Sequence, residues 1–125
     1  MTLTDGAVAS LAGQAADLIE PGLPVRVAPA ANDDPYRWGS HGWIVTIDAG
    51  VELEFWISSD ASPAEALRQF IDHLDEVSET ERYWGRAVPG CPGHRHMAEV
   101  AVEGDDVVLR CPATGKVVQR IHPDV

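Results

Sequence analysis

Both cysteines of this 125-residue chain lie in one short stretch, and each precedes proline in a turn that contains glycine. The first turn reads Gly90-Cys91-Pro92-Gly93-His94-Arg95-His96, and the second reads Cys111-Pro112-Ala113-Thr114-Gly115-Lys116. Such turns are typical of zinc knuckles, because a tight turn points one ligand and its near neighbour at the same cation. This stretch constrains the fold more than any other, since a shared ion requires the two turns to meet.

We predict that one metal ion is bound by four side chains: Cys91, His94, His96 and Cys111. Two thiolates and two imidazoles suit tetrahedral zinc, and four protein ligands make a closed, structural site. A standard zinc ribbon would place a ligand in the second turn where this chain has Thr114. Two alternatives stay open from the residues alone: a Cys91–Cys111 disulfide, and side chains that bind no ion.

An open, catalytic metal site is the second interpretation of the same residues. If one histidine swung away, water could fill its position, and Glu99 would be the nearest candidate base. The chain lacks the His-x-Glu and Cys-x-x-Cys signature of zinc deaminases, a phosphate-binding glycine loop and a recognisable Ser-His-Asp arrangement. We therefore expect a non-enzymatic binding protein first, and a small zinc-dependent hydrolase second.

The apolar pattern predicts a single α+β domain over residues 1–125. Helical spacing indicates one helix over residues 3–19 and another that begins after the cap Ser62 and ends near residue 84. Alternation indicates strands near residues 25–27, 43–48, 51–57, 97–103, 107–110 and 117–122, with a turn at 32–35. The order is α-β-β-β-α-β-β-β, a mostly antiparallel sheet with two helices packed on it. The knuckles form a C-terminal hairpin subregion over about residues 85–122.

Two strand registers follow from the pattern. A three-residue loop over residues 48–50 would pair Ile47 with Val51 and keep the apolar side chains of both strands on one face. In the C-terminal hairpin we expect Glu103 opposite Val107.

The C-terminal register would place Cys111 opposite Glu99 and close to His96. His122 would lie roughly 16 Å from Cys111, at about 3.3 Å per residue, which is too far to share an ion. We therefore expect His122 to be a bystander.

The charge is uneven, with a net value of −11. Residues 1–81 hold 15 of the 20 acidic residues and only three of the nine Lys and Arg residues, so nucleic-acid binding is disfavoured. The chain has no apolar run of membrane-spanning length, and its N-terminus lacks the features of a signal peptide. We expect a cytoplasmic protein with reduced cysteines.

A second candidate site involves one of the four tryptophans. Trp56 should face away from the core on the strand that also carries Glu52 and Glu54. A tryptophan among carboxylates resembles an anchor for a protein partner. The alternative is that other residues of the chain cover it.

Residues 84–112 resemble a group of small uncharacterised actinobacterial proteins that carry Cys-Pro-Gly-His-x-His and a later Cys-Pro. Many of those proteins have proline where this chain has Met97. The resemblance implies no established activity. The acidic α-β-β-β-α-β-β order is also similar to secretion-chaperone-like binding domains at the level of the fold alone. The acidic body, the Trp56 patch and the lack of a catalytic arrangement lead us to expect an adaptor, chaperone-like or immunity-type role.

Overall fold

The computed structural model describes residues 3–30 and 42–125 and has the α+β order expected from the sequence. The first half contains α1 (Asp5–Ala16), β1 (Val25–Pro29), β2 (Gly42–Asp48) and β3 (Glu52–Ser58). The second half contains α2 (Pro63–Asp72), the 3-10 helix η2 (Leu74–Glu79), β4 (Glu99–Glu103), β5 (Asp106–Arg110) and β6 (Val117–Ile121). The turn expected at 32–35 lies outside the described residues.

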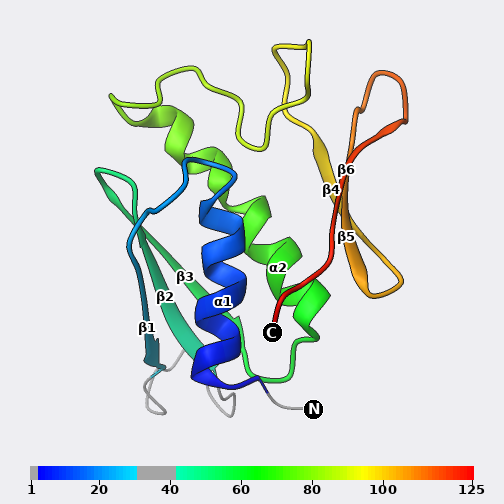
Figure 1. Cartoon of the computed structure of the whole chain (residues 1–125). Helices are drawn as coiled ribbons and strands as arrows, with labels where there is room; N and C mark the ends of the chain where they lie inside the picture. The colour runs from blue at the N-terminus through cyan, green and yellow to red at the C-terminus, as the bar shows by residue number, and fades with distance from the viewer. Residues whose placement is uncertain (1–2, 31–41) are drawn as a thin grey trace.

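The six strands form two antiparallel sheets of three strands, β1-β2-β3 and β4-β5-β6. Figure 1 shows the two helices between these sheets. α1 packs against β1, β2 and α2, whereas α2 also contacts β3, β4 and β5. The helices therefore form a middle layer that joins the N-terminal sheet to the C-terminal one.

The two helices begin where the sequence provides a cap. Thr4 Oγ1 accepts a hydrogen bond from the Ala7 N–H at 3.2 Å, and Ser62 Oγ accepts one from the Glu65 N–H at 3.1 Å. Pro63 then occupies the first turn of α2, where a missing N–H costs nothing.

α2 is shorter than expected, and its predicted end near residue 84 is wrong. The helix stops at Asp72 and is followed by the 3-10 turns of η2. Ser78 Oγ donates to the Asp75 carbonyl and Thr80 Oγ1 to the Val77 carbonyl, each at 2.7 Å and each three residues back. These bonds suit tighter turns, and acidic residues at a helix C-terminus oppose its dipole.

The β2–β3 register differs from the prediction by two residues. Ile47 pairs with Leu53 rather than Val51, so the three-residue loop covers residues 49–51 instead of 48–50. Asp48 stays in the ladder, and its Oδ1 accepts a hydrogen bond from the Gly50 N–H at 3.1 Å. Gly50 has φ of 87°, which glycine adopts without strain. A shift of two residues leaves every side chain on its predicted face.

The β4–β5 register differs by one residue, which has a larger effect. Glu103 pairs with Asp106 rather than Val107, and Glu99 pairs with Arg110 rather than Cys111. The connection is a two-residue turn at Gly104 and Asp105, and the φ of 64° at Gly104 suits the first central position of such a turn. The predicted pairing of Cys111 with Glu99 is therefore wrong.

A single cluster of buried apolar side chains connects all three layers. It includes Leu11 from α1, Ile47 from β2, Phe70 from α2 and Leu109 from β5, each no more than 2% exposed. Both cysteines belong to this cluster, so the sulfur atoms of the candidate site lie at the edge of the hydrophobic core.

Candidate metal centre

The first turn is closed by backbone hydrogen bonds around Cys91. The Cys91 N–H donates to the His96 carbonyl at 3.3 Å, and the His94 N–H donates to the Cys91 carbonyl at 3.0 Å. Gly93 has φ of 77°, a conformation that L residues rarely adopt. This loop turns the side chains of His94 and His96 toward the sulfur of Cys91.

The second turn repeats this arrangement around Cys111. The Cys111 N–H donates to the Lys116 carbonyl at 2.8 Å, and the Gly115 N–H donates to the Cys111 carbonyl at 2.7 Å. Gly115 has φ of 73°. Thr114 stands three positions after its cysteine, as His94 does in the first turn.

The two turns meet, and the four predicted ligands form one cluster. One ligand atom from each of Cys91, His94, His96 and Cys111 lies within 4.8 Å of the other three. The structure thus brings together a Cys2His2 set that could hold a metal ion.

Four of the separations between ligand atoms are close to those expected around a tetrahedral ion. His94 Nδ1 lies 3.4 Å from the sulfur of Cys91 and 3.4 Å from that of Cys111. His96 Nε2 lies 3.8 Å from the Cys111 sulfur and 2.9 Å from His94 Nδ1. Zinc bonds of about 2.3 Å to sulfur and about 2.05 Å to nitrogen place S and N about 3.6 Å apart and two N about 3.3 Å apart.

Hydrogen bonding alone does not account for the contacts of His94 Nδ1. Three atoms approach this nitrogen within 3.4 Å: the two cysteine sulfurs and His96 Nε2. An imidazole nitrogen offers either one N–H or one lone pair, so it can form one good hydrogen bond. A cation at the centre of the four atoms would satisfy all of them at once.

The other ring nitrogen of His96 is held by the backbone. His96 Nδ1 lies 3.1 Å from the Met97 carbonyl oxygen, and a carbonyl can only accept, so Nδ1 carries the proton. The lone pair is therefore on Nε2, the atom that faces the cluster. Metal-binding histidines commonly have such a partner, which fixes both the tautomer and the ring orientation.

The two sulfurs differ in their electrostatic environment. Hydrogen bonds from the Thr114 hydroxyl, together with those from the backbone of Thr114 and Ala113 and from the Cys91 side chain, lower the pKa of Cys111 to about 6 against the effect of burial. Burial, followed by the hydrogen bond and the charge of Cys111, raises the pKa of Cys91. Cys111 thus supplies a thiolate near neutral pH, which is the form that binds metals.

Thr114 is the residue of the site that the sequence did not assign. Thr114 is not a candidate ligand, but its hydroxyl forms a hydrogen bond with the sulfur of Cys111. Its position three residues after Cys111 was the feature of the sequence that could have indicated this role. The two cysteines are free thiols, and both are buried.

The remaining candidates lie elsewhere. Glu99 is exposed at the start of β4, and the cluster includes no carboxylate among the residues described. His122 Nδ1 lies 2.7 Å from Asp106 Oδ1, at the opposite end of β5 from Cys111. His122 therefore does not join the cluster, as the sequence predicted.

The predicted partner-binding surface of Trp56, Glu52 and Glu54 offers less exposed tryptophan than a binding anchor needs. Trp56 is half-buried, and a Cβ on Gly42 would approach its Nε1 to 2.8 Å, so the indole lies directly against this glycine. Glu52 forms an ion pair with Arg26 at 2.5 Å, and Glu54 is exposed. Trp84 is instead the most exposed of the large apolar residues described, at 77%.

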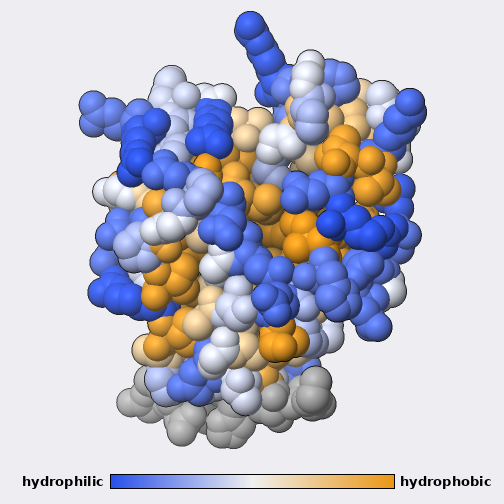
Figure 2. Space-filling model, in the orientation of Figure 1, coloured by the Kyte–Doolittle hydropathy of each residue, from blue (hydrophilic) through white to orange (hydrophobic). Residues whose placement is uncertain are grey.

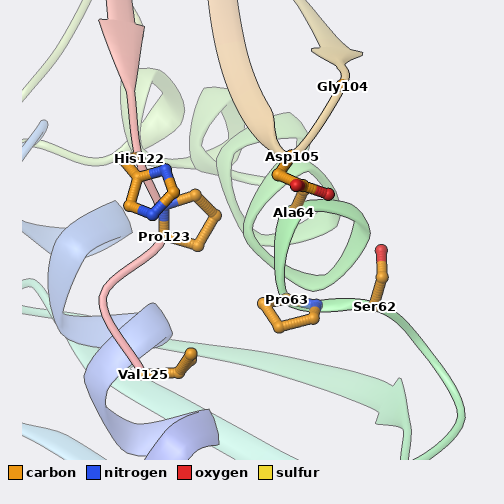
Figure 3. A pocket seen from close by; sticks show the side chains of 8 residues that line it. All are labelled: Ser62, Pro63, Ala64, Gly104, Asp105, His122, Pro123 and Val125. Carbon is orange, nitrogen blue, oxygen red and sulfur yellow. The ribbon is translucent and has the colours of Figure 1, made fainter. Parts of the chain in front are cut away.

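A cavity of about 320 Å³ lies at the other end of the molecule from the knuckles, between the start of α2, the β4–β5 turn and residues 122–125. Ser62 and His122 line opposite sides of it (Figure 3). Ser62 Oγ caps α2, so these two residues form no nucleophile–base pair.

No helix within the described part of the chain is long and apolar enough to cross a membrane. Comparisons with protein families, with curated proteins and with solved structures gave no match.

Proposed function

We propose that this protein is a small acidic protein-binding module, of an adaptor, chaperone-like or immunity type, in which structural zinc joins two turns. The observation that carries the zinc assignment is the convergence of four donor atoms from the two turns, three of them around His94 Nδ1. An ion at this point would join residues 91–96 to residues 111–116, two segments that belong to different connections of the fold.

The donor set favours zinc over other divalent ions. Thiolates are poor ligands for Mg²⁺ and Ca²⁺, whereas two sulfurs and two imidazoles in a tetrahedron suit Zn²⁺. The free, buried thiols are compatible with a reducing cytoplasm.

A structural role is better supported than a catalytic one. Catalytic zinc keeps one position for water, whereas the four donors here would fill a tetrahedron. The cluster also includes no carboxylate from residues 3–30 or 42–125 that could act as a general base. A zinc hydrolase would need one histidine to leave, and the Met97 carbonyl holds His96 in place.

The test is the metal content of protein purified without chelator. We expect one zinc per chain, strongly reduced in Cys111→Ser and His96→Ala, with a lower melting temperature in both. His122→Ala is the matched control and should keep the zinc. Elemental analysis that finds no zinc in the wild type, or equal loss in His122→Ala, would overturn the assignment.

A further inference from the structure

Three cations of the described residues stand out because they form no ion pair with a described carboxylate. Arg26, Arg68, Arg82, Arg110 and Arg120 each form an ion pair with a carboxylate. Arg86, Arg95 and Lys116 form none with residues 3–30 or 42–125. Arg86 lies over the Tyr83 ring, with its Cζ 5.7 Å from the ring centroid, but has no ion pair with a described carboxylate. Acidic residues outnumber Lys and Arg by 20 to nine in this chain, so a cation without an ion pair is unexpected.

Each unpaired cation stands within two positions of an exposed apolar side chain. Trp84, Met97 and Val117 are 77%, 38% and 42% exposed, and they neighbour Arg86, Arg95 and Lys116 in the sequence. The three segments that carry these residues, 84–86, 95–97 and 116–117, belong to connections at one end of the molecule, the end that carries the four-residue cluster (Figure 1). Figure 2 shows hydrophilic and hydrophobic residues intermingled over this end.

The loop that presents Trp84 is firmly anchored. Tyr83 is buried, and its hydroxyl donates to Glu20 Oε1 at 2.8 Å. The Arg86 N–H donates to the Tyr83 carbonyl at 2.9 Å, and the Gly85 N–H donates to the Ser78 carbonyl at 3.1 Å. The backbone on both sides of Trp84 is thus held in place while its side chain is exposed, so a partner would need to order little of the main chain on binding.

We propose that this end, defined by Trp84, Arg86, Arg95, Met97, Lys116 and Val117, binds an acidic peptide segment of a partner protein that also carries an aromatic or aliphatic anchor. The inference rests on the proposed protein-binding function and assigns it a surface different from the Trp56 face. Tryptophan, arginine and methionine are the residues enriched where interfaces gain most of their energy. The positive charges of Arg86, Arg95 and Lys116 would attract the carboxylates of such a peptide.

A peptide fits this surface better than a nucleic acid does. The acidic residues that dominate residues 1–81 repel a phosphate chain, which carries one charge per nucleotide. A few carboxylates spaced by apolar side chains meet less repulsion, since fields of the distant acids are screened within about 8 Å at physiological salt. Met97 and Val117 also offer contacts that suit aliphatic groups rather than phosphates.

The experiment is a selection of random dodecapeptides, displayed on phage, against the full chain loaded with zinc. We expect enriched sequences in which Asp or Glu adjoins an aromatic or aliphatic residue. A synthetic peptide of the most enriched sequence should bind Trp84→Ala at least tenfold more weakly and Arg86→Glu roughly fivefold more weakly. Neither residue belongs to the metal cluster, so both variants should keep their zinc.

The matched controls are Val125→Ala for an exposed apolar residue and Arg26→Glu for a paired cation, and both should bind normally. Enriched peptides without acidic bias, or peptides whose binding depends on Glu54 rather than Trp84, would overturn this surface and leave the protein-binding function standing. A selection that yields no binder would overturn both. Binding of oligothymidine that is lost in Trp84→Ala would identify a nucleic-acid surface instead.

Discussion

At the scale of single residues, the two turns of the metal centre are related but not equivalent. Three positions after its cysteine, the first turn has the ligand His94 and the second has Thr114, whose hydroxyl bonds to the Cys111 sulfur. The second turn therefore stabilises a thiolate where the first turn supplies an imidazole. Thr114 would therefore tune a metal site at this cluster without being a ligand itself.

Thr114→Val should weaken zinc binding without abolishing it. Loss of the hydroxyl removes a hydrogen bond to the thiolate and raises the pKa of Cys111 from about 6, so at neutral pH the proton competes better with the metal. We expect about tenfold lower affinity in a competition titration with a zinc indicator, at unchanged stoichiometry. Thr80→Val, which removes a hydroxyl bonded to the Val77 carbonyl, is the control and should bind zinc normally. Equal affinities in wild type and Thr114→Val would contradict this role.

Gly42 is a second residue that the structure singles out. A Cβ at this position would lie 2.4 Å from the Ile57 carbonyl oxygen and 2.8 Å from Trp56 Nε1. Gly42→Ala should therefore lower the free energy of unfolding by about 1–3 kcal/mol, measured by urea denaturation. Gly13, inside α1, has no atom within 4 Å of an added Cβ, and Gly13→Ala should raise stability by about 0.5–1 kcal/mol. Equal effects of the two substitutions would contradict the packing of Trp56 on Gly42.

At the scale of elements, the outer face of the C-terminal sheet is joined by ion pairs. Glu103 on β4 accepts from Arg110 on β5 at 2.6 Å and from Arg120 on β6 at 2.9 Å. Asp106 accepts from His122 at 2.7 Å and from Arg120 at 3.3 Å. The carboxylate of Glu103 on the edge strand β4 therefore contacts arginines of both β5 and β6, and the pairs hold three strands together across their exposed side.

These pairs should make the sheet sensitive to acid. Arg120, followed by Arg110, lowers the pKa of Glu103, so its contribution to stability is complete above the unfolded-state pKa near 4.3 and is lost as pH falls through the folded-state value. Glu103→Gln should be less stable than the wild type at pH 7, and the difference should shrink below about pH 4. Urea midpoints of both proteins across this range measure the effect. A difference that stays constant down to pH 3 would contradict it.

The same elements show how far sequence reasoning extends. The order of helices and strands was predicted because capping residues and apolar spacing are local signals, as at Ser62. The registers were not, because Gly50 and Gly104 each permit more than one turn, and the choice depends on side-chain contacts across the sheet. The four-ligand cluster was still predicted, since the turns themselves place the ligands and the strand register matters less.

At the scale of the whole molecule, metal removal should loosen one end and leave the rest folded. The N-terminal sheet and the helices supply most of the buried apolar cluster, whereas the regular structure of residues 85–98 before β4 is an isolated bridge between Gly90 and Met97. We expect a chelator to accelerate amide hydrogen exchange over about residues 85–122 and to leave α1 and β2 protected. Acid should do the same, because thiolate and neutral imidazole are the binding forms. Uniform acceleration across the chain would contradict this division.

The exposure of Trp84 was beyond the reach of the sequence. Tyr83 and Trp84 are adjacent aromatic residues in a segment expected to be helical, and only the early end of α2 decides that one is buried and the other is not. Trp56 shows the opposite case: the sequence predicted that it faces away from the core, but it packs against Gly42, which lies 14 positions away in the sequence. Burial of single aromatic residues thus depends on tertiary contacts that periodicity does not encode.

Side chains of α1 hold the segment after β6 by three hydrogen bonds, which together are called the C-terminal clasp. Gln14 donates to the His122 carbonyl and accepts from the Asp124 N–H, while Ser10 donates to the Asp124 carbonyl. Under mechanical tension applied at residue 125, this clasp would yield first, and β6 would then peel from β5 one residue pair at a time, from Ile121 back to Val117. The peeling would next reach the turn that contains Cys111. A coordinated ion would there arrest the extension, so the metal would set the length of chain that a pull can release.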